Sequence, residues 1–127
     1  MDPQHSEQES SVAKQLRHLD EAVALSRVGG DSELLREVAE LFLEDYPNAL
    51  GKIRTAVVAG DQAGLEQHAH SLKGSISTFG AQAAFDAALA LERQGRSGDL
   101  NGAEDGLSRL EQALAALRPE LEAIQAK

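Results

Sequence analysis

Residues 62–81 read QAGLEQHAHSLKGSISTFGA, and the spacing of their apolar side chains predicts an α-helix from about Gln62 to Phe79. On a helical wheel of ~100° per residue, five apolar side chains lie within about 40° of one direction, so this side must face a core. They are Leu65, Ala69, Leu72, Ile76 and Phe79. Gly80 follows, and a glycine at this place ends a helix because it readily adopts the left-handed conformation.

The side of this helix that faces away from the core carries four residues that lie close together on its surface. They are His70, Lys73, Gly74 and Ser77, at positions i, i+3, i+4 and i+7. His68 falls on the other flank, near the rim of the core. Because the two histidines point about 200° apart on a helix, they cannot coordinate one metal ion together, as two histidines at this spacing on a strand could. No metal site is predicted in this chain.

The chemistry of His70 depends on its neighbours along the helix. An exposed imidazole is a competent nucleophile near neutral pH. Lys73, one turn away, would partly offset the charge of about −2 on a phosphoryl group carried by that ring. Gly74 costs the helix about 0.5–1 kcal/mol relative to alanine. Either this glycine is a neutral accident, or it leaves a flat patch where the backbone of another protein can approach closely.

The apolar spacing predicts four further helices. Their approximate ranges are 12–27, 32–59, 81–93 and 100–124. Gly29-Gly30 ends the first of them, and Asp31 then stands where an N-cap belongs. Gly60 and Asp61 repeat this stop-and-start pattern before the histidine-bearing helix.

Several details of these helices are also predicted. The core-facing stripe of 32–59 is expected to contain Leu34, Val38, Leu41, Phe42, Tyr46, Ala49, Ile53 and Val57. Pro47 lies inside this range, and we expect a kink or a local break there because proline removes a helical hydrogen bond. Residues 95–98 are expected to form a connecting loop, with Asp99 as the N-cap of the last helix.

The last helix carries leucines at alternating steps of three and four, which is a heptad seam. Such a seam is typical of a helix lying antiparallel in a bundle, although it could also indicate a coiled-coil dimer. Pro119 is expected to bend its final turns. Short joins make successive helices antiparallel neighbours. The predicted fold class is therefore all-α: an up-and-down antiparallel four-helix bundle with an additional N-terminal helix, present as a monomer.

Composition sets the broad class of the protein. Alanine and leucine supply 39 of 127 residues, which favours helix over sheet. The absence of cysteine excludes a disulfide scaffold, and a net charge of −9 argues against binding nucleic acid. Without a bilayer-length apolar run, we expect no membrane insertion and a cytoplasmic protein. Residues 1–11 read as a disordered tail or an expression remnant, and 12–127 as one domain.

The stretch from Ala69 to Ala81 resembles the signature of histidine-containing phosphotransfer (HPt) domains. That signature has a histidine, a lysine three residues on, a glycine four on, and a second glycine ten on followed by a small residue. Here these are His70, Lys73, Gly74, Gly80 and Ala81, without departure. The preceding segment, with Leu41-Phe42-Leu43-Glu44-Asp45-Tyr46-Pro47, also resembles the family. The resemblance covers about residues 19–124.

The resemblance implies a phosphocarrier that passes a phosphoryl group between aspartates of response-regulator receiver domains, downstream of hybrid sensor histidine kinases. His70 would be phosphorylated on its outer ring nitrogen. Lys73 would support the phosphoryl charge, Gly74 and Ser77 would belong to the docking surface, and Gly80 would end the helix and allow close packing. The receiver would supply Mg²⁺, so this chain needs no cofactor of its own. A membrane-bound hybrid kinase, if it includes this chain, would tether it.

Two alternatives remain at this stage. The chain could be the amino-terminal phosphotransfer domain of a chemotaxis-type kinase, phosphorylated directly by a kinase domain. It could also be a non-catalytic helical adaptor that binds partners through the same surface. An autonomous kinase is excluded, because the sequence has no glycine-rich nucleotide loop.

Overall fold

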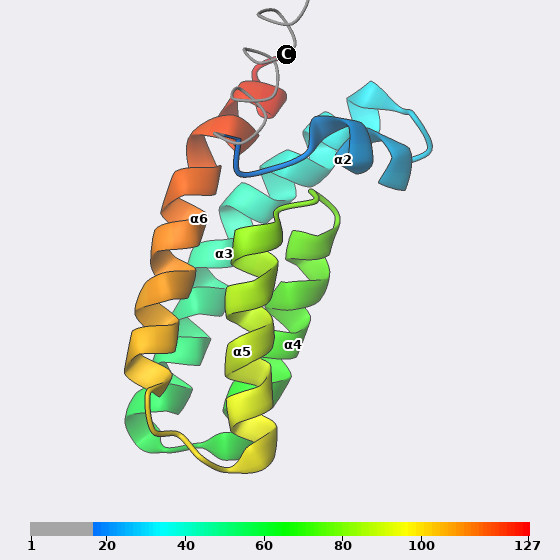
Figure 1. Cartoon of the computed structure of the whole chain (residues 1–127). Helices are drawn as coiled ribbons and strands as arrows, with labels where there is room; N and C mark the ends of the chain where they lie inside the picture. Colours follow the sequence, from blue (N-terminus) through cyan, green and yellow to red (C-terminus); the bar gives the residue numbers. More distant parts are fainter. Residues whose placement is uncertain (1–16) are drawn as a thin grey trace, which may run out of the picture.

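The computed structural model describes residues 17–127, which form five α-helices (Figure 1). They are α2 (Glu21–Arg27), α3 (Ser32–Ala59), α4 (Gln62–Ser77), α5 (Gln82–Ser97) and α6 (Ala103–Gln125). The predicted tail, 1–11, and the first part of the helix predicted at 12–27 lie outside the described residues.

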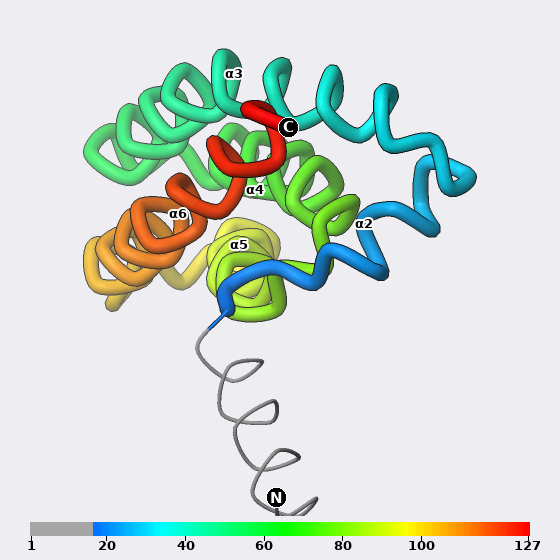
Figure 2. Tube along the Cα trace, turned by 90° about the horizontal axis from the view of Figure 1, so that it is seen from above, coloured from blue at the N-terminus to red at the C-terminus, as the bar shows by residue number. Residues whose placement is uncertain are grey.

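Helices α3 to α6 form an antiparallel four-helix bundle, and α2 lies across one end of it (Figures 1 and 2). The neighbours around the bundle are α3 with α4, α4 with α5, α5 with α6, and α6 with α3. This arrangement confirms the predicted fold class. It also accounts for the heptad seam of α6, because the leucines at 107, 110, 114, 117 and 121 are all buried inside this one bundle.

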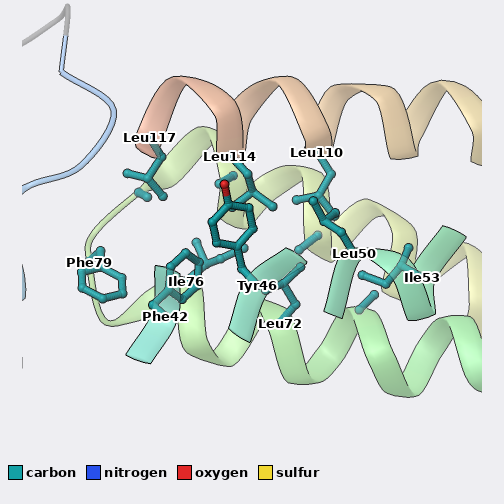
Figure 3. Close-up of a cluster of buried hydrophobic side chains, with 14 of the residues drawn as sticks. Phe42, Tyr46, Leu50, Ile53, Leu72, Ile76, Phe79, Leu110, Leu114 and Leu117 are labelled. Carbon is teal, nitrogen blue, oxygen red and sulfur yellow. The ribbon is translucent and has the colours of Figure 1, made fainter. Parts of the chain in front are cut away.

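The core between these helices is mostly aliphatic, with a small aromatic group at one end (Figure 3). The ring of Phe42 stacks on that of Tyr46 and meets the edge of Phe79, with centroid separations of 5.4 and 5.2 Å. All five apolar residues predicted for the inner side of the histidine-bearing helix are buried, although α4 ends at Ser77 and Phe79 follows it. The outer side of α4 is therefore fixed by the packing of its inner side.

Residues 17–20, directly before α2, are not helical, so the continuous helix predicted over 12–27 is wrong. Residues 17–20 use their backbone groups in tertiary contacts instead. The N–H of His18 donates to the carboxylate of Glu120 at 2.8 Å, and the N–H of Asp20 donates to the carbonyl of Phe79 at 3.0 Å. The Asp20 side chain then caps α2 by accepting from the N–H of Val23.

Helix α3 is rotated slightly about its own axis, so the residues that it buries differ from the predicted stripe. Leu35 and Ala39 are buried, whereas Leu34 and Leu41 are 41% and 58% exposed. The apolar arc on this helix is broader than the core needs. The predicted stripe, with Leu34 and Leu41, and the observed one, with Leu35 and Ala39, both have helical spacing. Packing against α4 on one side and α6 on the other selects the part that is buried. An apolar edge of α3 is left at the surface.

Neither proline breaks its helix. Helix α3 continues through Pro47 and α6 continues through Pro119, so the predicted local break does not occur. Both prolines are exposed. The carbonyl that each proline leaves without a helical partner costs little where water can reach it, and long buried stripes hold both helices together.

The connection between α5 and α6 is displaced from its predicted position. Helix α5 runs to Ser97, so Gly95 lies inside the helix and is buried. The N-cap of α6 is Gly102, with φ +81°. Asp99 lies before it, in the loop, where its side chain accepts from the N–H of Asn101. A loop at 95–98 and an N-cap at Asp99 are both wrong.

Gly95 is required where α5 touches the backbone of α4. A Cβ atom at this position would lie 2.5 Å from the nitrogen of Glu66 and 2.8 Å from the carbonyl oxygen of Gln62. These atoms belong to backbone and cannot turn aside as a flexible side chain can. The two helices must therefore approach more closely here than any other residue would allow.

The substitution Gly95→Ala tests this contact. We expect it to lower the free energy of unfolding by about 1–3 kcal/mol, because the added methyl group forces α5 away from α4. Gly51→Ala is the matched control, since a Cβ there meets nothing within 4 Å in the middle of α3. The control should stabilise the protein by about 0.5–1 kcal/mol. Urea unfolding followed by circular dichroism measures both, and a Gly95→Ala protein as stable as the control would contradict the close approach.

Candidate functional site

Helix α4 presents His70 to solvent from the middle of its outer side. The helix begins at a fixed point, because the Asp61 carboxylate accepts from the N–H of Gly64 at 3.0 Å. From that start, its inner side is buried in the core and the His70 side chain is 67% exposed. The predicted outward position of His70 is confirmed.

A buried carboxylate lies directly behind His70. Glu92 on α5 is only 2% exposed, and it is the one buried charged residue in the described part of the chain. Its Oε1 atom bonds to Nδ1 of His70, and its Oε2 atom accepts from Nζ of Lys73 at 3.0 Å. A buried charge needs such partners, and Glu92 has two.

The charge state of Glu92 follows from these contacts. Burial raises the pKa of its carboxyl group. The hydrogen bonds from Lys73 and His70 and the positive charge of these partners lower the pKa, and their combined effect is larger than that of burial. The net effect holds the pKa of Glu92 below the ordinary value of 4.5. Glu92 is therefore ionised near neutral pH and can only accept hydrogen bonds.

An ionised Glu92 decides which nitrogen of His70 is available. A carboxylate can only accept, so Nδ1 must carry the proton of the neutral ring. The other nitrogen, Nε2, then keeps its lone pair on the exposed side of the ring. The site thus presents an oriented nucleophile with a charged group behind it.

Lys73 is held beside this pair. Its side chain is 19% exposed, and its ammonium lies 5.9 Å from the centre of the Phe85 ring as well as against Glu92. The sequence predicted Lys73 next to His70, and the structure places both against the same carboxylate. The positive charge stays near the imidazole because α5 holds it there.

Gly74 leaves the backbone of α4 bare next to His70. It is exposed, and a Cβ built on it would meet nothing within 4 Å. Packing among residues 17–127 therefore gives no reason for a glycine. Open space above this backbone is what a surface in contact with another protein would use.

Ser77 and Gly80 lie farther from the imidazole. Ser77 is two helical turns from His70, about 10 Å along the axis, and its hydroxyl donates to the carbonyl of Gly74 at 2.6 Å. Gly80 has φ +61°, and a Cβ there would lie 3.0 Å from the Cβ of Asp20. The structure brings neither residue to the ring. Gly80 closes α4 against the chain that leads into α2.

The other described histidines do not join this site. His68 is half-buried on the opposite flank of α4, as predicted, and His18 is exposed near α2. Within residues 17–127, no three histidine, aspartate or glutamate side chains gather closely enough to hold a metal ion.

None of the helices described is long and apolar enough to cross a membrane.

A shallow groove lies between α3 and α4, on the flank of α4 that faces α3, and Ser71 next to His70 is one of its lining residues. Its volume is about 260 Å³. On the α3 side it is lined by Val38 and the exposed Leu41, and on the α4 side by Ser71, Ser75 and Thr78. The apolar edge of α3 that is not buried in the core thus borders the outer side of α4.

Glu92 is not among the site residues predicted from the sequence. A signal was present, because Ala84, Ala88, Leu91 and Gly95 form the inner side of α5 and Glu92 lies on the margin of that side. A charged residue within an apolar stripe indicates either a paired buried group or a functional one. The wrong helix end near Arg93 hid this signal by placing Glu92 beside a loop.

A family model described as Hpt domain matches residues 37–120 of the chain. Among solved structures, the chain is similar to histidine-containing phosphotransfer protein B (HptB) from Pseudomonas aeruginosa PAO1. The two share 28% identity with a TM-score of 0.79, over 86% of this chain and 95% of that one. The HPT domain of a sensor hybrid histidine kinase from Shewanella has the same fold, with 20% identity and a TM-score of 0.76, over 87% and 96%. A comparison with curated protein sequences gave no match.

The buried carboxylate should make stability depend on pH. The pKa of Glu92 is lower in the folded protein than in the unfolded chain, so its contribution is present above pH 4.5 and is lost as the pH falls through the folded pKa. Near pH 7 we expect Glu92→Gln to cost about 1–3 kcal/mol in unfolding free energy, and this difference should shrink at acidic pH. Glu66→Gln, at a partly exposed carboxylate paired with Arg96, is the control. Equal pH dependence of the two variants in urea unfolding would contradict the assignment.

Proposed function

The chain belongs to the histidine-containing phosphotransfer (Hpt) family and acts in phosphorelay signalling, and from this premise we propose that His70 is the residue that carries the phosphoryl group. The family match spans the whole site, from α3 into α6. One observation supports His70 above all: it is an exposed imidazole whose inner nitrogen is bonded to a buried carboxylate. His68, the other histidine on α4, has no comparable geometry.

In the proposed reaction, Nε2 of His70 attacks the phosphorus of an aspartyl phosphate on a receiver domain. The N–P bond forms as the P–O bond to the aspartate breaks, and the aspartate leaves as a carboxylate. The reverse steps deliver the group to a second receiver. The chain has no kinase activity in this scheme, because it supplies a positioned nucleophile and the partner supplies the group.

Lys73 is proposed to support the added charge. A phosphoryl group on Nε2 brings a charge of about −2 to a place where Glu92 is already negative. The ammonium of Lys73, 3.0 Å from Glu92, offsets that carboxylate, so that the phosphoryl oxygens do not face an uncompensated negative charge. Positive charge is scarce in this acidic chain, so its position beside the imidazole matters.

The partners proposed are receiver domains, which would supply Mg²⁺ with their acidic pocket, and a hybrid sensor histidine kinase upstream. No cofactor is assigned to this chain, which we propose acts as a monomer in the cytoplasm. The docking face would be the outer side of α4 with the neighbouring edge of α3. Gly74 gives it a flat centre, and Leu41 with its groove gives it an apolar border.

The phosphoacceptor is tested by phosphoryl transfer from a phosphorylated receiver domain with Mg²⁺. We expect the wild-type protein to take up the label and His70→Gln to take up none, because the nucleophile is gone. His68→Gln, two residues away on the other flank, should transfer as the wild type does. Uptake by His70→Gln at the wild-type level would disprove the assignment, and a wild-type protein without uptake would favour a non-catalytic adaptor.

The docking role of Gly74 is tested by Gly74→Leu. The open space above this position should accept the side chain without loss of helicity, while the bulk keeps the receiver from the helix surface. We expect affinity for the receiver to fall at least about tenfold, equal to about 1.4 kcal/mol. Ala90→Leu, in the exposed groove between α5 and α6, is the matched control and should leave binding unchanged. If Gly74→Leu binds like this control in calorimetry, the explanation for the glycine is lost.

A further inference from the structure

We propose that Glu92 is a positioning residue that keeps the proton on Nδ1 of His70 throughout phosphoryl transfer, so that the ring accepts and releases the group without exchanging a proton with water. This inference rests on the proposed function of His70. It extends that function by assigning a role to a residue on a different helix, behind the reacting nitrogen.

The geometry makes Glu92 suited to hold a proton in place. The carboxylate is buried, so water does not compete for its oxygens. Lys73 donates to Oε2 at 3.0 Å and to Oε1 at 3.3 Å, which holds the carboxylate with Oε1 directed at Nδ1 of His70. Gly95, one turn further along α5, lets the backbones of α4 and α5 approach closely enough for this contact. The hydrogen bond is therefore built by the packing of two helices and does not depend on a flexible surface side chain.

Acceptance of the group builds positive charge on the ring. As Nε2 forms its bond to phosphorus and the receiver aspartate leaves, the ring still carries the Nδ1 proton and becomes cationic. A fixed carboxylate against Nδ1 stabilises that charge as it develops. The proton need not leave the ring, because Glu92 and the cationic ring form a charge-assisted hydrogen bond.

Release uses the same proton. When the phosphoryl group moves to a receiver aspartate, the N–P bond breaks and its electron pair returns to Nε2. With Nδ1 protonated, the ring leaves as neutral imidazole. If Nδ1 had lost its proton, the ring would have to leave as an anion, which is a much poorer leaving group. By holding the proton, Glu92 keeps the carried group transferable at alkaline pH.

The charges around Glu92 are consistent with this role. On α4, His70 and Lys73 bond to it, while Glu66 pairs with Arg96 of α5 at the surface. On the other side of α5, Asp86 and Arg109 line the separate groove facing α6. The bonds to the carboxylate therefore come from the imidazole and from the lysine that offsets its charge.

Glu92→Gln in the full chain is the central test. The amide is nearly the same size, but it is uncharged and can also donate a hydrogen bond, so it does not retain the Nδ1 proton. Each phosphorylated protein is mixed with receiver and Mg²⁺ between about pH 6 and 9, and its transfer rate is divided by that of the wild type. We expect the ratio for Glu92→Gln to be near one at the acidic end and to fall about tenfold or more at the alkaline end. Glu66→Gln, which removes a nearby negative charge without touching the ring, should keep a constant ratio.

A second measurement needs no partner. Nitrogen-15 NMR of the unphosphorylated protein reports which ring nitrogen of His70 carries the proton. We expect the Nδ1-protonated form in the wild type and in Glu66→Gln, and a mixture in Glu92→Gln. Glu92→Asp keeps the charge on a shorter side chain and should restore part of the alkaline transfer rate, which a purely structural role of the residue would not explain.

The outcomes separate this inference from the proposed function. A wild-type protein that takes up no phosphoryl group, or a His70→Gln protein that does, overturns the proposed function. If His70 is phosphorylated and the ratio for Glu92→Gln is as constant with pH as that for Glu66→Gln, the role given to Glu92 is wrong. The same conclusion follows if Glu92→Gln leaves the Nδ1 tautomer of His70 unchanged.

Discussion

The buried carboxylate of Glu92 is the constraint that links the fold of this protein to its chemistry. Burial of a charge is costly, and it is tolerated here because His70 and Lys73 on the neighbouring helix both bond to it. One turn further along α5, Gly95 allows α4 and α5 to approach backbone to backbone next to these bonds. Helix packing, the orientation of the imidazole and the position of the lysine thus depend on one another.

The bundle divides α4 into two sides with different tasks. Its inner side belongs to a core in which large side chains from α3, α4 and α6 interlock (Figure 3). Its outer side carries small residues and one exposed imidazole, and it continues into the apolar edge of α3 at Leu41. A rigid inner side holds the nucleophile still, while the outer side stays open to a partner that brings the phosphoryl group.

Local signals in the sequence were enough to predict most of the elements. The aspartate caps at Asp31 and Asp61 and the glycine stops before them act within a few residues, so they could be read directly. Errors arose where distant contacts decided the outcome. The bonds of residues 17–20 to Glu120 and Phe79 replace a helix, and the contact of Gly95 with α4 turns an apparent loop into a buried helical turn.

The sequence by itself determined that the chain is helical, that His70 lies on the outer side of its helix, and that Lys73 and Gly74 lie one turn away. These properties follow from the helical period, which depends only on the order of residues along one element. Only the tertiary structure decided which partner His70 would meet. Periodicity shows which side of α5 is buried, but the residue opposite Glu92 depends on the register and closeness of two packed helices. That packing placed a carboxylate behind the imidazole and left its outer nitrogen free.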